Sequence, residues 1–253
     1  MENEEISIMD LVIETHVVLD RQGPGSPETT IKALSFIEDL SKISKVVDLA
    51  CGTGGQTLVL AQNISGNIIG VDICSDFINI FNNNVKKLNL QERVKGIIGS
   101  MDNLSFQIDE FDLIWSEGAI DNIGFEKGLN YWISFLKKNG YIAVTCPSWL
   151  TNERPEEIEK FWSNSGSGLD TIGNNISIMQ KIGYKIISIF TLPEKCWVDN
   201  YFIPREEAEK ALLKKYKGNK IVEEYIKDEK YEVELYSKYK QYYGYVFYIG
   251  QKI

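Results

Sequence analysis

A glycine-rich turn near residue 50 carries the clearest chemical signal in the chain. The segment from Val46 to Thr57 reads VVDLACGTGGQT, an apolar run with an acid at Asp48 followed by closely spaced glycines. Glycines permit a sharp turn from a strand into a helix and let a ligand approach the backbone closely. The N-terminus of that helix carries about half a positive charge and unpaired N–H groups. We therefore expect the turn to hold an anionic group of a ligand.

A second acid lies where it can complete the same site. Asp72 ends the next β-rich run after the glycine turn. A carboxylate at the end of the second strand of a βαβ unit can accept two hydrogen bonds from a ribose diol. Together the two features predict a ligand of the adenosine type that lies across the carboxyl ends of parallel strands.

The elements that position these residues alternate along the chain. Strands are predicted at 45–50, 67–72, 94–99, 111–116, 140–146, 184–192 and 245–251. Helix-length stretches such as 54–64 and 75–88 separate the early strands, and strands separated by helices force a parallel sheet that is covered on both faces. We therefore expect an α/β fold with a Rossmann-like, doubly wound, seven-stranded sheet.

Local signals place two element boundaries. Ser26 and Pro27 are a typical cap and first residue of a helix, and apolar residues within 31–40 recur at three-residue steps that predict a buried face. Asn139 and Gly140 are predicted to end a helix and begin the fifth strand. Glycine would supply the positive φ that such a boundary requires.

The chain is predicted to form one domain over 1–253, with three additions to the alternating core. Residues 1–26 form an N-terminal helix and a Gly-Pro-Gly turn, and the segments 148–183 and 193–243 are mostly helical insertions. A length of 253 residues fits a single domain of this kind. We expect the two insertions to form a lid over the substrate.

Composition limits the classes of function. The net charge of −9 repels polyanions, so nucleic-acid binding is not expected. The acidic segment 1–5 is unlike a secretory signal, and no apolar run is long enough to span a membrane. The cysteines at 51, 74, 146 and 196 show no C-x-x-C spacing. We therefore expect reduced thiols, no metal site and a cytoplasmic protein.

The glycine turn resembles motif I of the class I S-adenosylmethionine-dependent methyltransferases, (D/E)-x-G-x-G-x-G, with Ala50 in place of the first glycine. Three further segments resemble the family's motifs in the same order. Gly99–Asp102 is similar to its adenine-binding segment, Phe111–Gly118 to its motif IV, and Leu136–Tyr141 to the segment that leads into strand five. The resemblance covers roughly residues 21–251 and points to the ubiquinone/menaquinone methyltransferase-like group of bacterial small-molecule methyltransferases. It implies an antiparallel last strand.

The resemblance also implies S-adenosylmethionine as the cofactor. Asp72 would bind its ribose, Met101 would cover the adenine, and Asp102 would accept a hydrogen bond from the adenine amine. Asp48 would attract the ammonium of the methionine end, directly or through water, while the carboxylate of that end would lie near the helix dipole or Arg21. The residues expected to bind the cofactor are Arg21, Asp48, Ala50, Cys51, Gly52, Gly54, Gln56, Thr57, Asp72, Ile73, Ser100, Met101, Asp102 and Glu117.

The expected reaction is in-line transfer of a methyl group to a small-molecule acceptor, which releases S-adenosylhomocysteine. Glu117 and Asp121 follow the fourth strand, at the edge where an acceptor would enter. A carboxylate there can bind a cationic acceptor or take its proton, and an ordinary hydrogen-bonded acid is an equally good interpretation. Otherwise a tyrosine or solvent takes the proton. His16 precedes the motifs and is predicted to lie on a helix face rather than to act as a base.

Two groups of side chains leave alternatives open. Some relatives methylate arsenicals bound by cysteine thiolates, and Cys146 and Cys196 lie at the ends of strands five and six. Nothing in the sequence lowers their pKa, so buried, inert thiols are the preferred interpretation. Trp197 and the tyrosines of the second insertion either line an aromatic acceptor pocket or pack the insertion onto the sheet.

Three other functions compete with this interpretation. The acceptor could be a protein or a tRNA, or the chain could bind S-adenosylmethionine without transferring a methyl group. A nicotinamide-dependent oxidoreductase is the third alternative, and the acid before the glycines and the seventh strand argue against it. The sequence leaves the oligomeric state open, including a homodimer.

Overall fold

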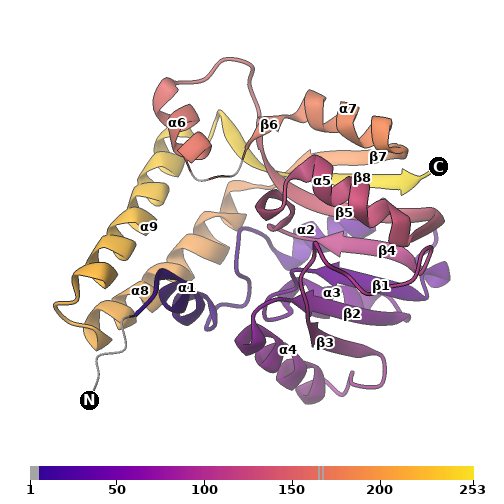
Figure 1. The fold of residues 1–253 in the computed structure, drawn as a ribbon, viewed down its shortest axis with the longest axis horizontal. Coiled ribbons are helices and arrows are strands. Elements are labelled where there is room, and N and C mark those ends of the chain that lie inside the picture. The colour runs from indigo at the N-terminus through magenta and orange to yellow at the C-terminus, as the bar shows by residue number, and fades with distance from the viewer. Residues whose placement is uncertain (1–5, 165, 167) are drawn as a thin grey trace.

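A single mixed sheet forms the centre of the molecule, with helices on both of its faces (Figure 1). The computed structural model describes residues 6–164, 166 and 168–253, so the acidic segment 1–5 lies outside the described residues. The strands run in the order β3-β2-β1-β4-β5-β8-β7, and β6 pairs with β5. Their bounds are β1 Lys45–Leu49, β2 Asn67–Asp72, β3 Val94–Ile98, β4 Phe111–Ser116, β5 Leu136–Trp149, β6 Asp170–Thr171, β7 Tyr184–Thr191 and β8 Tyr243–Lys252.

The pairing of the strands follows the predicted topology. β1 pairs in parallel with both β2 and β4, β2 with β3, and β4 with β5. β8 is antiparallel to both β5 and β7. The seven predicted strands and the antiparallel last strand are therefore confirmed, and the short strand β6 is an addition to them. The order of the strands reverses between β1 and β4, and the carboxyl ends of strands at such a point form a crevice for ligands.

Helices cover both faces of the sheet and extend beyond one end of it (Figure 1). The face covered by α2, α3 and α4 lies opposite the face covered by α5 and α7. Helices α1, α6, α8 and α9 gather at the side of the sheet. The bounds are α1 Ile8–His16, α2 Pro27–Leu34, α3 Gly55–Asn63, α4 Ser75–Lys87, α5 Phe125–Trp132, α6 Glu156–Asn164, α7 Ile172–Ile182, α8 Ile203–Lys215 and α9 Lys220–Tyr239.

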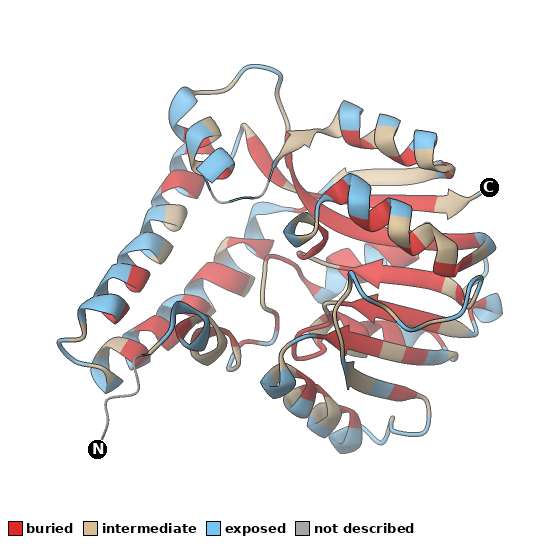
Figure 2. Ribbon diagram, viewed as in Figure 1, coloured by how far each residue is buried: buried red, intermediate tan, exposed pale blue. Residues whose placement is uncertain are grey.

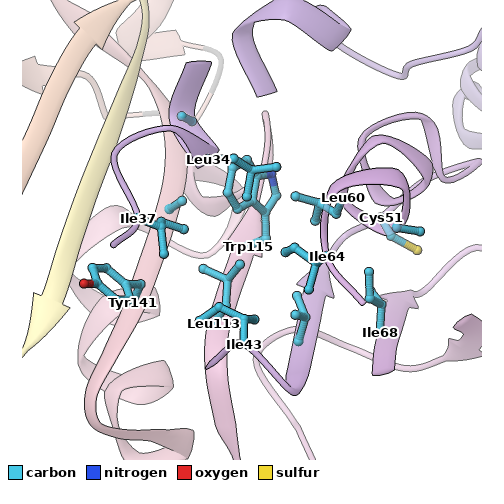
Figure 3. Close-up of a cluster of buried hydrophobic side chains, with 14 of the residues drawn as sticks. Leu34, Ile37, Ile43, Cys51, Leu60, Ile64, Ile68, Leu113, Trp115 and Tyr141 are labelled. Carbon is cyan, nitrogen blue, oxygen red and sulfur yellow. The ribbon is translucent and has the colours of Figure 1, made fainter. Parts of the chain in front are cut away.

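The central strands are buried on both faces, as strands between two helical layers must be (Figure 2). On one face Trp115 of β4 packs among apolar side chains such as Leu34 of α2 and Leu60 of α3 (Figure 3). On the other face Trp132 and Met179 are fully buried. Two packed layers thus hold the sheet rigid beneath the crevice.

The predicted second insertion is helical and is anchored by aromatic rings. A π-helix, Val198–Phe202, leads into α8, and α9 returns the chain to β8. Trp197 stacks on Tyr236 of α9 with ring centroids 4.5 Å apart, and it meets the edge of Tyr243 of β8. All three rings are buried. Trp197 and these tyrosines therefore pack the insertion onto the end of the sheet, which was one of the two interpretations of their pattern.

Two boundaries differ from the sequence prediction. Helix α2 ends at Leu34, and Ile31 is 47% exposed because residues at three-residue steps drift around a helix of 3.6 residues per turn. Strand β5 begins at Leu136, and Asn139, not Gly140, has the positive φ of 63°. A Cβ at Gly140 would lie 2.8 Å from the carbonyl oxygen of Lys137, so the glycine serves close packing instead.

No helix among the described residues is both long and apolar enough to cross a membrane. Within the same residues, no group of three or more His, Cys, Asp or Glu side chains is arranged to hold a metal ion.

Candidate active site

The turn between β1 and α3 adopts the left-handed backbone that its glycines permit. Ala50, Gly52 and Gly54 have φ values of 56°, 56° and 89°. A Cβ at Gly52 would collide with the side-chain oxygen of Gln22, and one at Gly54 would collide with the ring of Phe81. These two glycines are therefore required by sterics as well as by conformation. Ala50 tolerates the left-handed region at a cost of about 1–2 kcal/mol, which explains why another residue can replace the first glycine of the motif.

Asp72 ties the glycine turn to the end of β2. Its Oδ2 accepts a hydrogen bond from the backbone N–H of Gly52 at 2.8 Å, and its Oδ1 accepts one from Cys74 at 2.9 Å. The side chain is mostly buried, and burial raises its pKa despite these two bonds. The carboxylate lies at the carboxyl end of its strand and faces the turn, as the spacing of the sequence predicted.

Asp48 lies behind the turn. It is fully buried in β1, and its Oδ2 accepts a hydrogen bond from Thr57 Oγ1 of α3 at 2.5 Å. Burial raises its pKa to about 8, and the nearby charge of Glu117 adds to the shift. Asp48 thus joins the strand to the helix after the turn, and its contact with a ligand ammonium stays a prediction.

A segment before α2, which we call the strap (residues 19–25), lies across the glycine turn. The side chain of Gln22 donates from Nε2 to Thr53 Oγ1 at 3.0 Å and to the carbonyl oxygen of Leu19 at 3.1 Å. Its Oε1 accepts from the backbone N–H of Thr53 at 2.9 Å. Gln22 was not among the predicted site residues, and no local pattern in the sequence connects it with Thr53.

Arg21 of the strap forms a buried ion pair with Glu117, which follows β4. Its Nη1 lies 2.7 Å from Glu117 Oε2, and the two side chains are 9% and 4% exposed. Arg21 Nη2 also donates to Thr30 Oγ1 at 3.0 Å. Glu117 Oε1 accepts from Thr30 Oγ1 at 2.7 Å and from Trp115 Nε1 at 2.9 Å. Three donors therefore hold the Glu117 carboxylate in place.

A cavity of about 190 Å³ lies where these groups meet, at the carboxyl ends of β1, β2 and β4. Larger hollows of about 670 and 550 Å³ run along α9 and between α8 and α9, but none of the predicted cofactor-binding residues lines them. The chemistry therefore favours the smaller cavity. It is lined by Arg21, Gln22, Gly23, Pro24, Ala50, Cys51, Gly52, Gln56, Asp72, Phe77, Glu117, Gly118, Ala119 and Asn122.

The remaining predicted residues lie outside the lining of this cavity. Gly54 and Thr57 are in the turn and the first turn of α3, with Asp48 behind them. Ile73 is 75% exposed beside Asp72. The other four predicted residues do not line the cavity either. Ser100 donates a hydrogen bond to Asp102, which also lies 3.9 Å from Lys127 Nζ. The Met101 carbonyl oxygen accepts from Trp132 Nε1 at 2.8 Å, and Asp121 is in the turn Ile120–Asn122.

The groups around the cavity fit a sulfonium nucleoside. Gly52 lines the cavity with its backbone, while Gln22 Oε1 fills the space in which a Cβ of residue 52 would lie. A carboxylate, Asp72, and a guanidinium, Arg21, both line the cavity. The first is suited to a ribose diol, and the second to the carboxylate of a methionine end.

His16 and the cysteines have ordinary structural surroundings. His16 is buried on α1, its Nδ1 lies 2.8 Å from the carbonyl oxygen of Val12, and burial lowers its pKa. This confirms the helix-face interpretation. Cys146 and Cys196 are buried, and burial raises the pKa of both thiols. The preference for inert thiols is supported, because a thiolate nucleophile needs a lowered pKa.

Comparison with known proteins places most of the chain in one family. Residues 40–195, more than half of the chain, match the family model described as a methyltransferase domain. The phosphoethanolamine N-methyltransferase of Plasmodium falciparum is 34% identical over 126 residues, which cover 48% of this chain and 45% of that protein. The demethylmenaquinone methyltransferase of Lactobacillus johnsonii is 28% identical over 109 residues, 42% of this chain and 45% of that protein. The chain thus matches less than half the length of these two relatives.

Solved structures agree in fold over nearly the whole chain. A SAM-dependent methyltransferase from Thiobacillus denitrificans, solved in complex with S-adenosyl-L-homocysteine, superposes with a TM-score of 0.83 at 19% identity and covers 96% of this chain and 98% of its own. One from Geobacter sulfurreducens gives 0.81 at 19% identity, with 95% and 97% covered. The family model, the order of the strands and the glycine turn agree, and the chain belongs to the methyltransferase-domain family.

Proposed function

We propose that this protein transfers a methyl group from S-adenosylmethionine to a small-molecule acceptor and releases S-adenosylhomocysteine. One observation carries the proposal: the cavity brings the glycine turn at Gly52, the Asp72 carboxylate and the Arg21–Glu117 ion pair together at the carboxyl ends of the strands. These groups come from distant parts of the sequence and have the chemistry that the donor requires.

Different residues in and around the cavity would bind different parts of the donor. Asp72 would bind the ribose diol, and Arg21 with the N-terminus of α3 would bind the carboxylate of the methionine end. Ile73, Ser100, Met101 and Asp102 would border the adenine outside the present cavity lining. Asp48, behind the turn, would contact the ammonium directly or through water, and the bound cation would favour the ionised form of this buried acid. When bound, the donor supplies a methyl group on a sulfonium, which is already an activated electrophile.

The protein contributes orientation and exclusion of water. The strap covers the turn, and Glu117, Gly118 and Asn122 form the wall along which an acceptor would approach. Proximity and orientation of this kind can contribute about 7–11 kcal/mol to a transfer step. Glu117 already accepts from three donors, so we assign it to holding Arg21 and the wall. A proton released by the acceptor would pass to Asp121 or to solvent.

Several features support a small acceptor. The charge of −9 disfavours RNA, and the aromatic insertion closes one end of the sheet with packed rings. The named relatives act on phosphoethanolamine and demethylmenaquinone, which are both small molecules. We propose that the insertions at 148–183 and 193–243 form the lid of the acceptor site through helices α6, α8 and α9. Helix α7 of the first insertion instead packs on the sheet beside α5, which corrects the expectation for that helix. The four cysteines are all unpaired, which supports a cytoplasmic location.

Two measurements test the proposal. Calorimetry should detect binding of S-adenosylmethionine and S-adenosylhomocysteine and no comparable binding of NADH, which separates a methyltransferase from an oxidoreductase. A screen of small amines, quinols and carboxylic acids, with release of S-adenosylhomocysteine as the readout, should then identify the acceptor. Binding without turnover on any acceptor, including tRNA and protein extracts, would support a non-catalytic sensor instead.

A further inference from the structure

Helix α1 is attached to the α8–α9 insertion rather than to the sheet. Leu11 is fully buried in an apolar cluster with Leu212 of α8 and Val222 of α9. Glu14 accepts from Lys215 Nζ at 2.5 Å and from the Tyr216 hydroxyl at 2.8 Å. Figure 1 shows α1 beside α8, at the side of the sheet. A displacement of α8 would therefore carry α1 with it.

The last turn of α1 is held by a directed set of hydrogen bonds. His16 Nδ1 lies 2.8 Å from the Val12 carbonyl oxygen, which can only accept, so Nδ1 carries the proton. Burial lowers the pKa of the ring and so favours its neutral form, in which His16 Nε2 accepts from the Tyr201 hydroxyl at 3.0 Å. The Tyr201 oxygen in turn accepts from Arg205 Nη1 at 3.2 Å. The direction of each bond is thus fixed.

Arg205 anchors the far end of this set. Its side chain is 1% exposed, and Nη1 lies 2.7 Å from both Glu229 Oε2 and Glu232 Oε2 of α9. Its Nη2 donates to the backbone oxygen of Glu229 at 3.0 Å. A buried guanidinium with several acceptors has little freedom to move. The position of Tyr201, and through it of His16, is therefore set by the packing of α8 against α9.

Gln22 completes the connection to the glycine turn. Its Nε2 donates to Thr53 Oγ1, and the backbone oxygens of His16 at 3.2 Å and Leu19 at 3.1 Å share its second N–H. Its Oε1 accepts from the Thr53 N–H. The same oxygen occupies the space where a side chain of Gly52 would be. One glutamine thus contacts both the end of α1 and the turn that we assign to the donor.

We propose that Gln22, His16 and Tyr201 are positioning residues of the donor site. They transmit the placement of the α8–α9 insertion to the glycine turn, so that donor affinity depends on a tyrosine that does not line the donor cavity. The effect on affinity rests on the proposed function, because it requires that the donor binds at this turn. The effect on the stability of the turn in the unliganded protein does not depend on that function.

Hydrogen exchange in the unliganded full-length chain tests the connection without any donor. The variant Tyr201→Phe removes the shared hydroxyl and keeps the ring. We expect the amides of peptide 50–57, which contains Thr53, to exchange faster in Tyr201→Phe than in the wild type. Gln22→Met should show the same increase. The matched control is Tyr243→Phe, because the Tyr243 hydroxyl is buried and has no hydrogen-bond partner among the described residues. Its exchange in this peptide should equal that of the wild type.

Calorimetry with S-adenosylhomocysteine tests the consequence. Tyr201→Phe and Gln22→Met should each weaken binding by roughly two- to tenfold, the range expected for one lost neutral hydrogen bond. The double variant should bind S-adenosylhomocysteine no more weakly than the single variant with the lower affinity, because both changes interrupt the same connection. Tyr243→Phe and Gln251→Met, a matched change at the far end of the sheet, should bind like the wild type.

The outcomes separate the two proposals. If the wild type does not bind S-adenosylhomocysteine, the proposed function fails, and exchange alone decides whether the connection exists. If the wild type binds but Tyr201→Phe matches Tyr243→Phe in both exchange and affinity, the positioning role is wrong and the function stands. A double variant whose loss equals the product of the single losses would also overturn the coupling. Should Tyr201→Phe not fold, exchange in the peptide that contains Tyr201 is compared between Gln22→Met and Gln251→Met, because a connection that carries an effect in one direction carries it in the other. Equal exchange in the two variants would overturn the coupling.

Discussion

Arg21 and Glu117 are 96 residues apart in the sequence, yet their charged groups lie 2.7 Å apart in the wall of the candidate donor cavity. The pair fastens the strap to the end of β4, and Thr30 of α2 bonds to both partners. The ion pair therefore closes the site between two segments that share no secondary structure. A change at either residue therefore leaves the other without its charged partner.

Glu117→Gln should destabilise the protein and weaken donor binding. In one orientation the Gln amide group turns its N–H towards Arg21, which then loses its acceptor. In the other orientation the N–H faces Thr30 and Trp115, and these donors lose theirs. Removing one partner of a buried ion pair costs about 3–5 kcal/mol. Denaturant unfolding measures this cost. The double variant Arg21→Met/Glu117→Gln should recover part of the lost stability, and a double variant that is less stable than Glu117→Gln would contradict the argument.

Asp72→Ala should weaken binding of S-adenosylmethionine by roughly tenfold or more, since charge-assisted hydrogen bonds to a ribose contribute about 1.5–3 kcal/mol each. It also removes the acceptor of the Gly52 amide. Calorimetry measures the affinity. The control is Asp109→Ala, because Asp109 forms a surface ion pair with Lys252 away from the cavity. Unchanged affinity in Asp72→Ala would show that the ribose is not held by this acid.

The parts of the site that could be predicted from the sequence are those tied to local chemistry. Gly52 and Gly54 stand in one short turn, and Asp72 stands at a strand end, so spacing alone brought them together. Gln22 and Thr30 could not be predicted in this way, because their contacts with Thr53 and Glu117 depend on how the strap crosses the sheet. No periodic or local pattern encodes such a crossing.

The fold shows the same division. The alternation of strands and helices predicted the sheet and its seven main strands, because the spacing of apolar residues along each segment indicates which side chains are buried. The predicted start of β5 at residue 140 was wrong, because the strand begins at Leu136 and passes through Asn139 instead of starting after it. Asn139, not Gly140, has the positive φ. Asn is among the few residues that tolerate this region, so a neighbouring pair of Asn and Gly leaves the choice to tertiary packing.

Gly54→Ala should destabilise the protein, whereas the same change at Gly173 should not. At Gly54 the φ of 89° disfavours any side chain, and a Cβ would collide with the buried ring of Phe81. The conformational part alone is worth about 1 kcal/mol or more. Gly173 is in α7 with nothing within 4 Å of an added Cβ, so alanine there should be neutral or stabilising by up to about 1 kcal/mol. Thermal unfolding of the two variants decides; equal loss in both would refute the steric argument.

The buried acid Asp48 should give the unliganded protein a stability that falls as pH rises. An unfolded Asp titrates near pH 3.9, and in the folded state burial raises the pKa of Asp48 to about 8. Between these values the folded chain binds more protons than the unfolded chain, so this contribution is fully present below about pH 4 and is lost as pH rises towards 8.

Asp48→Asn should remove this dependence, because Asn is neutral at every pH and its carbonyl oxygen can still accept from Thr57 Oγ1. We expect the variant to match the wild type near pH 4 and to exceed it near pH 8. The difference between the two unfolding profiles isolates Asp48 from other buried acids such as Glu229, whose pKa burial raises to about 7. Parallel profiles for the wild type and the variant would show that Asp48 is not protonated in the folded state.

The thiols should not take part in the methyl transfer. Cys51, Cys146 and Cys196 are buried, and burial raises the pKa of each, while Cys74 is partly exposed. A thiol reagent should therefore modify Cys74 in the folded protein and reach the other three only on unfolding. The double variant Cys146→Ala/Cys196→Ala should keep its turnover on the identified acceptor. Loss of turnover in a folded, donor-binding double variant would assign these thiols to the acceptor site.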